Sequence, residues 1–165
     1  MSGGEVRNMY NENDLKIVSF LREDSRTSLT RLSRKTGIPV STIFERLRRS
    51  TGDIVRKNTC LIDFSKIGMH ARANLVLKVV PGEREKLKEY LIKNRNVNSL
   101  QKINNGFDYM ADVVFSDLKE LEEFCEVLDE RFQIMAKQVY YVIEEIESEK
   151  FLSSPETLTI LGLPR

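Results

Sequence analysis

The sequence predicts an α+β protein in two parts: three short helices and a hairpin in residues 13–63, then a strand–helix–strand unit repeated twice in residues 71–147. In the first part apolar residues recur every three to four positions, as along one side of a helix. In the second part several segments alternate apolar and polar residues, as on a strand. The charge divides in the same place. Residues 1–68 carry 13 Lys and Arg against eight Asp and Glu, and the remaining residues carry 13 against 17, so we expect a different kind of partner for each part.

The composition of the 165-residue chain, with 41% hydrophobic residues, is that of a folded protein. It has no run of about 18 apolar residues that would cross a membrane, and its first residues (1–12, expected to be flexible) lack the apolar core of a secretory signal. The two cysteines, Cys60 and Cys125, fit no CxxC pattern and are expected to be free thiols in a reducing cytoplasm. We therefore expect a cytoplasmic protein without a membrane partner, a metal or a cofactor.

The first two helices are predicted from apolar spacing and from residues that favour helix ends. Segment 14–24 has apolar residues at helical intervals, and Asn13 or Asp14 can cap its start. Segment 28–37 opens with a serine suited to an N-cap and closes with a glycine that supplies a turn or a C-cap. Two short helices joined through a turn are therefore expected to precede the third.

The third helix, which follows Pro39, has two different faces. At 100° per residue its apolar side chains form one stripe, composed of Val40, Ile43, Phe44 and Leu47. The remaining surface carries hydroxyl groups, one carboxylate and arginines: Ser41, Thr42, Glu45, Arg46, Arg48 and Arg49. Such side chains can bond base edges and phosphates. Segment 28–37 and this third helix form a pair joined through a glycine turn, and the later helix of the pair is polar on its outer face. Such a pair predicts a helix-turn-helix.

A basic hairpin is predicted after the third helix. Ile54 and Val55 on one side and segment 60–62 on the other flank Arg56 and Lys57, which would meet phosphates as the tip of a wing. We expect Ser41, Thr42, Glu45, Arg46 and Arg49 in the major groove, with Arg48, Arg56 and Lys57 at phosphates. The alternative is an ordinary three-helix bundle with a solvated arginine face, because charged faces often only meet water.

The second part has the order βαββαβ. Strands are predicted at 71–80, 97–105, 106–116 and 134–146, and helices at 81–94 and 117–132. Two such halves, with both helices on one face of a four-stranded antiparallel sheet, form a ferredoxin-like domain. The sequence has no further helix for the other face. In the last strand, the residues that point to either face of the sheet include apolar or aromatic side chains. We therefore expect a second copy to cover the open face and form a homodimer.

Three segments in this order resemble the Lrp/AsnC (feast/famine) family of transcription regulators over residues 13–147. LTRLSRKTGIPVSTIFERLRR (29–49) is similar to that family's DNA-reading helix pair, LIDFSKIG (61–68) to its linker strand, and NNGFDYMADVVF (104–115) to its turn and strand. The resemblance implies a winged helix-turn-helix domain, a linker (64–70) and an effector-binding ferredoxin-like domain. It also implies a sequence-specific regulator that forms dimers, commonly assembled to octamers, and binds small effectors, often amino acids. The sequence departs from the family pattern at Asp53, a polar residue before the wing.

By the same resemblance, the effector would lie near the turn formed by Asn105, Gly106, Phe107 and Asp108. Gly106 would let the backbone approach a ligand closely. Asp108 would either meet an amino group or bond local backbone as a strand-end residue. The segment 148–165 extends beyond the family's usual end, and its leucines would either dock on a neighbouring subunit or fray.

Two other functions remain open from the sequence. Siroheme decarboxylases resemble this two-domain plan and use histidines, whereas this chain has only His70, in the expected linker; a lone linker histidine is usually a surface residue. A sensing module that modulates another regulator without touching DNA is the other alternative, and the basic third helix argues against it. A DNA-binding regulator, not an enzyme, is therefore the leading hypothesis.

Overall fold

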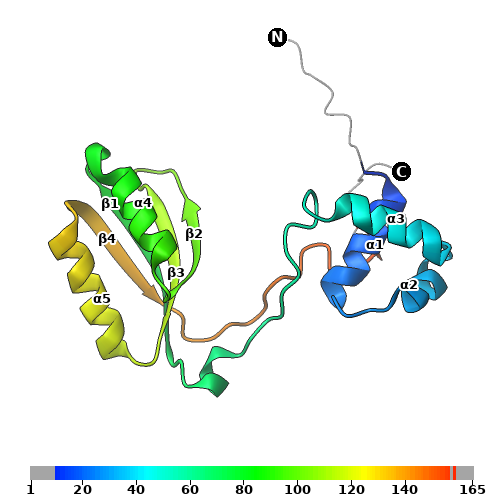
Figure 1. The fold of residues 1–165 in the computed structure, drawn as a ribbon. Helices are drawn as coiled ribbons and strands as arrows, with labels where there is room; N and C mark the ends of the chain where they lie inside the picture. The colour runs from blue at the N-terminus through cyan, green and yellow to red at the C-terminus, as the bar shows by residue number, and fades with distance from the viewer. Residues whose placement is uncertain (1–9, 157, 159–165) are drawn as a thin grey trace, which may run out of the picture. The chain divides into compact units, whose positions relative to one another are not determined.

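The computed structural model describes residues 10–156 and 158, which form two compact units (Figure 1). The first unit combines the chain up to Leu61 with the chain from Glu147 onward. The second unit is Ile62–Ile146 and includes the expected linker. In the part of the chain that the structure describes, no helix is long and apolar enough to cross a membrane. The sheet unit thus lies in sequence between the two parts of the first unit.

The first unit contains α1 (Glu12–Glu23), α2 (Leu29–Thr36) and α3 (Val40–Ser50). The predicted caps of α2 are confirmed, because the Ser28 side chain accepts a hydrogen bond from the Arg31 backbone N–H and Gly37 is left-handed with φ of 74°.

The predicted cap of α1 was wrong, because Asn11 caps the helix two residues earlier than Asn13. The Asn11 side chain accepts from the Asp14 backbone N–H, and the Asp14 carboxylate accepts from the Asn11 backbone N–H. Each end of this reciprocal capping box satisfies a backbone donor that the first turn leaves unpaired. Residues 1–9 of the N-terminus lie outside the described residues, whereas Tyr10 is buried, so the expected flexible region does not extend to residue 12.

The core of the three helices is small. Ile17, Leu32 and Ile43 are fully buried at its centre, one from each helix. The predicted apolar stripe of α3 was too wide, because Phe44 is 54% exposed and Val40 is 41% exposed. A narrow contact between three short helices buries about one residue in each turn of α3, so Phe44, one position on from Ile43, points away from it.

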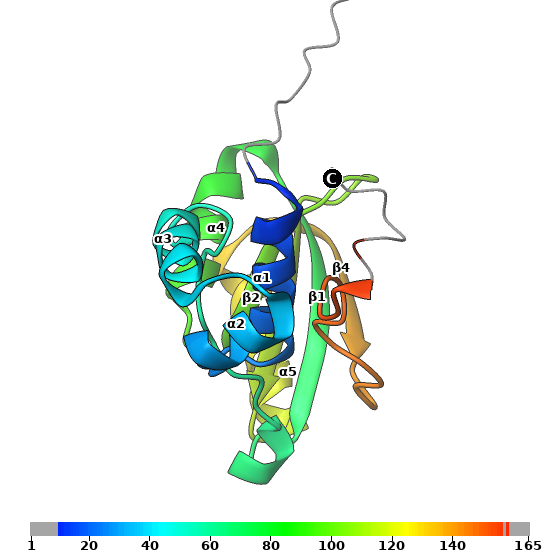
Figure 2. The same ribbon diagram turned by 90° about the vertical axis from the view of Figure 1, so that its right-hand side faces the viewer.

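The second unit is the predicted ferredoxin-like domain. Its elements in order are β1 (Ala71–Val79), α4 (Arg84–Lys93), β2 (Val97–Lys102), β3 (Tyr109–Phe115), α5 (Leu118–Arg131) and β4 (Ile134–Tyr141). The strands pair antiparallel in the order β2-β3-β1-β4, and α4 and α5 lie on one face (Figure 2). The second, third and last strands are shorter than predicted, because a turn replaces residues 103–108 and the chain leaves the sheet after Tyr141.

The two faces of the sheet differ as the alternation in β1 predicts. Its buried residues alternate with half-buried ones, and Leu75 and Leu77 pack fully buried against α4 and α5 leucines. On the opposite face, Arg72 of β1 forms a two-pronged ion pair with Asp112 of β3, at 2.9 and 3.0 Å. Asn98 of β2 donates to the same carboxylate at 2.6 Å. A polar network therefore crosses three strands on the face of the sheet opposite α4 and α5.

Candidate functional site

The outward face of α3 borders an open hollow of about 610 Å³, lined by Thr42, Glu45, Arg46, Arg48 and Arg49. Ser41 is also exposed. The Glu45 carboxylate lies 3.1 Å from the Arg48 guanidinium one turn away, and both side chains are well exposed. The structure thus brings the predicted α3 residues other than Ser41 to one hollow, where they offer hydrogen-bond donors and acceptors. Donors of this kind can bond phosphates and the acceptor groups of base edges.

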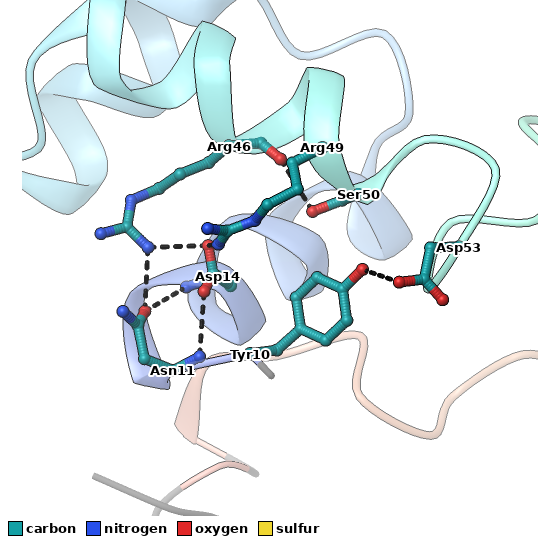
Figure 3. Close-up of polar contacts among 7 residues, drawn as sticks. All are labelled: Tyr10, Asn11, Asp14, Arg46, Arg49, Ser50 and Asp53. Carbon is teal, nitrogen blue, oxygen red and sulfur yellow. Dashed lines mark hydrogen bonds and ion pairs between the residues drawn. The ribbon is translucent and has the colours of Figure 1, made fainter. Parts of the chain in front are cut away.

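A buried carboxylate on α1 holds two of these arginines (Figure 3). One Asp14 oxygen lies 2.7 Å from Nη1 of Arg46 and 3.0 Å from Nη2 of Arg49. The Arg46 Nη1 also donates to the Asn11 side-chain oxygen at 3.0 Å. The first turn of α1 is thereby joined to the middle and end of α3. Sequence reasoning assigned Asp14 only to capping, because a helix wheel cannot show which neighbouring helix a side chain meets.

The two arginines are held to different degrees. The Arg46 side chain is only 23% exposed, and its Nε atom is buried without a hydrogen-bond partner among the described residues. The Arg49 side chain is 55% exposed and keeps donors free of Asp14. Arg46 therefore links α3 to α1, whereas Arg49 can be held by Asp14 and still present donors to a ligand.

The Asp14 carboxyl is kept ionised by its partners. Burial by itself raises the pKa of this group, but the Asn11 backbone N–H and the guanidinium groups of Arg46 and Arg49 outweigh burial and hold the pKa below its usual value. An ionised Asp14 offsets part of the positive charge within α3. The α1–α3 contact therefore depends on a charge that is present at neutral pH.

Tyr10 and Asp53 form a second link between the start of α1 and the end of α3. The Tyr10 hydroxyl donates to the Asp53 carboxylate in the turn after α3, and the Arg49 guanidinium lies over the Tyr10 ring, 5.9 Å from its centroid. The hydrogen bond to Asp53, then burial, raises the pKa of the Tyr10 hydroxyl. Asp53, a departure from the family pattern in the sequence, thus has a defined contact within the unit.

The predicted hairpin after α3 was wrong in its pairing. A tight turn closes instead by an isolated bridge between Thr51 and Val55, and the Val55 N–H donates to the Ser50 carbonyl at 3.0 Å. Because this turn uses the backbone groups of Val55, residues 60–62 have no strand partner within the described chain and are exposed. Arg56 and Lys57 follow the turn directly and are exposed, so both basic groups remain at the end of α3.

The turn predicted to approach an effector connects β2 to β3. Asn105 and Gly106 are both left-handed, with φ of 60° and 84°, a conformation that favours glycine and asparagine. Asn105 and Gly106 are exposed, and Phe107 is half-buried. The turn is therefore exposed at Asn105 and Gly106, and the role of Gly106 at an effector stays a prediction.

Asp108, at the end of this turn, has its carboxylate occupied within the chain. One oxygen accepts from the Val79 backbone N–H at 3.0 Å, and the other lies 2.7 Å from Nε of Arg84. Only 8% of the residue is exposed. These are the local contacts of a strand-end residue, and they join the end of β1 and the start of β3 to the start of α4.

A pocket of about 270 Å³ lies next to the turn and was not predicted from the sequence. Its lining comes from α4 and from the strand ends beside the turn: Glu85, Lys88, Ile92, Leu100, Lys102 and Tyr109. It combines two lysines and one carboxylate with an apolar wall, and Glu85 pairs with Lys88 at its edge. Helical and strand periodicity place these residues on separate elements, so only the tertiary fold reveals that they meet.

The remaining candidate groups are His70, Cys60 and Cys125. His70 is exposed just before β1, and its backbone N–H donates to the Ser116 carbonyl. Cys60 is exposed, whereas Cys125 is buried, and neither is in a disulfide. Among the described residues, no group of three or more His, Cys, Asp or Glu side chains could hold a metal ion.

Comparisons with known proteins agree with this two-unit description. Residues 10–49 match the family model described as winged helix-turn-helix DNA-binding. An uncharacterized HTH-type transcriptional regulator of Pyrococcus furiosus is 32% identical over 117 residues, which are 70% of this chain and 79% of that protein. LrpC of Bacillus subtilis superposes with a TM-score of 0.75 at 23% identity, over 84% of this chain and 98% of that one. A transcriptional regulator of Neisseria meningitidis, solved with L-methionine, gives 0.76 at 21% identity over 84% and 92%.

Proposed function

This chain belongs to the Lrp/AsnC family of DNA-binding transcription regulators, and from that membership we propose that it recognises duplex DNA with α3 and responds to an amino acid bound by its sheet unit. The observation that carries the proposal is the two-sided character of α3. Ile43 is buried in the helical core, while the opposite face presents hydroxyl, carboxylate and guanidinium groups. Because its target is chromosomal DNA, we place its action in the cytoplasm.

We assign the DNA contacts by exposure and by internal partners. Base edges in the major groove are contacted by Ser41, Thr42, Glu45 and Arg49. Phosphates are contacted by Arg48, Arg56 and Lys57, which are all exposed. Arg46 moves from base contact, its sequence-based assignment, to positioning, because Asp14 and Asn11 use its Nη1.

We further propose a homodimer formed through the open face of the sheet, with assembly to octamers as the family relation implies. Tyr140 is 55% exposed on this face, and Arg72, Asn98 and Asp112 supply polar groups that a second copy can meet. An exposed aromatic group beside an ordered polar network is the kind of surface that a partner chain covers.

Selection of bound duplexes from a random library tests the DNA and dimer proposals together. We expect a two-fold repeated site whose half-sites lie about one helical turn, or a multiple of it, apart, because two copies of α3 enter successive major grooves. Enrichment of a single unrepeated half-site would contradict the dimer on DNA. Recovery of random sequence would contradict specific recognition, and sequence-independent binding by charge would then be the function.

For the effector, we propose the pocket between α4 and β2. A free amino acid has a carboxylate that Lys88 and Lys102 can bind and an ammonium group that Glu85 can bind, while Ile92 and Leu100 suit an apolar side chain. About 270 Å³ is at the small end for ligand cavities, which suits a compact effector. The L-methionine complex of a structural neighbour supports the amino-acid class. Asn105, Gly106 and Phe107 form the adjacent rim, while Asp108 holds the turn.

Lys102→Ala is expected to weaken amino-acid binding about tenfold, because a charged hydrogen bond to the effector carboxylate is lost. Calorimetric titration with individual L-amino acids measures the effect. Lys119→Ala is the matched control, since Lys119 is an exposed lysine of the same unit on α5, away from the pocket. Unchanged affinity of the Lys102 variant would exclude this pocket, and a wild type that binds no amino acid would exclude the effector class.

A further inference from the structure

The chain after the sheet unit returns to the DNA-binding unit. Residues from Glu147 onward cluster with α1–α3, so the sheet unit is joined in sequence to the DNA-binding unit both before Ile62 and after Ile146 (Figure 1). Sequence analysis left two fates for this C-terminal segment, docking on a neighbour or fraying. The structure shows a third, in which Glu149, Phe151 and Leu158 contact α1 of the same chain.

Arg22, near the C-terminal end of α1, binds the segment. Arg22 donates from Nε to the Phe151 carbonyl at 2.7 Å and from Nη2 to the Glu149 carbonyl at 3.1 Å. The same Nη2 lies 2.7 Å from the Glu149 carboxylate. Glu149 and Leu152 are left-handed, with φ of 53° and 58°, a conformation that such residues seldom adopt without contacts to hold it.

Tyr10, just before α1, and Leu15 in its first turn bury Leu158 of the segment. Leu158 is 7% exposed and forms an apolar cluster with Tyr10 and Leu15, and Leu152 packs at its edge. This cluster is separate from the Ile17–Leu32–Ile43 core. Leu15 of α1 therefore belongs to the contact with the C-terminal segment.

Tyr10 connects this cluster to α3 and to the turn that follows it. Its ring packs with Leu158, its hydroxyl donates to Asp53 in the turn after α3, and its ring face lies under the Arg49 guanidinium. A displacement of Tyr10 would therefore release Asp53 and take the Tyr10 ring away from Arg49, which would then be held by Asp14.

We propose that residues 147–158 are a positioning segment for DNA recognition: by burying Tyr10 against Leu158, the segment fixes the turn at Asp53 and the side chain of Arg49. The inference rests on the proposed contact of Arg49 with bases. Leu158 and Tyr10 are positioning residues, since they act on DNA only through Arg49 and the turn that precedes Arg56. The sheet unit is thus continuous in sequence with α3 at its start and with the segment that contacts Tyr10 at its end.

Leu158→Ala and Tyr10→Phe, each in the full-length protein, test the proposal by DNA affinity on the selected site. Each is expected to weaken binding about tenfold, the effect of loosening one charged contact. Tyr10→Phe keeps the ring and removes only the bond to Asp53. Glu156→Ala, an exposed change in the same segment, is the matched control.

A double variant separates positioning from general damage. In an Arg49→Ala background, Leu158→Ala is expected to cost less affinity than it does alone, because the part of its effect that acts through Arg49 is gone. Full additivity, or wild-type affinity of both single variants, overturns the proposal. If Arg49→Ala binds DNA like wild type, the proposed base contact of Arg49 is contradicted, independently of the C-terminal segment. If Leu158→Ala perturbs the fold, seen as lost protection of α1 amides, Tyr10→Phe decides: weakened binding with unchanged α1 protection supports the proposal, and wild-type affinity contradicts it.

Discussion

Asp14→Ala is expected to lower the free energy of unfolding of the DNA-binding unit by about 3–5 kcal/mol, the usual effect of removing one partner from a buried ion pair. The substitution leaves Arg46, only 23% exposed, without its carboxylate. It also removes the capping box at the start of α1 and the acceptor that holds Arg49. Amide hydrogen exchange in α1 and α3 measures this change without requiring the two units to unfold together.

The matched control is Glu12→Ala, since Glu12 is an exposed acid in the same first turn of α1. It is expected to change stability by less than about 0.5 kcal/mol. A loss below about 1 kcal/mol in Asp14→Ala would show that α1 and α3 are held by their apolar core alone.

The same carboxylate makes stability depend on pH. The pKa of Asp14 in the folded protein lies below its ordinary value, so the unfolded chain binds this proton more readily than the folded one. Its contribution is therefore complete above the ordinary pKa of about 4 and is lost as the pH falls from there through the lower folded pKa. Asp14→Ala should lose less stability than wild type over that acid range.

Arg49→Ala is expected to relax base preference, with a loss of about 1–3 kcal/mol on the selected site and little loss on unrelated sequence. Arg49 is the arginine of α3 that is both held by Asp14 and more than half exposed. A held side chain loses little freedom when it binds, which favours selective contact over general attraction. Competition binding on the selected site and on a scrambled duplex measures the two affinities.

Lys57→Ala is the paired comparison for a phosphate contact. It should weaken both duplexes by the same factor and lower the slope of log affinity against log salt by about one. Lys119→Ala, which removes the same charge from the sheet unit, should change neither quantity. Unchanged binding by both the Arg49 and Lys57 variants would remove α3 and its following turn from the interface.

These variants separate two uses of the charges on α3. Arg46 and Asp14 face each other inside the unit, so their substitution should lower the stability of its fold. Arg48, Arg56 and Lys57 are exposed, and their loss is a matter of binding. Arg49 takes part in both, so its variant should be compared with wild type at temperatures where both are fully folded.

Local features of the sequence determined the elements and their order. The serine and glycine at the ends of 28–37, the alternation in 71–80 and the leucine spacing in 117–132 each depend on neighbours within one turn or one strand. Backbone preferences and side-chain direction act at that range. The helix-turn-helix, the ferredoxin-like order and the buried face of β1 therefore followed from the sequence.

Only the tertiary structure decided which charged and aromatic groups meet. Asp14 lies 32 residues before Arg46, Tyr10 lies 43 residues before Asp53, and Arg22 lies 127 residues before Glu149. No periodic pattern encodes such pairs, because they depend on how whole elements pack and on which polar groups that packing removes from water. For the same reason the sequence showed an arginine face on α3, while the fold alone separated the arginine that holds the helix from those free to bind.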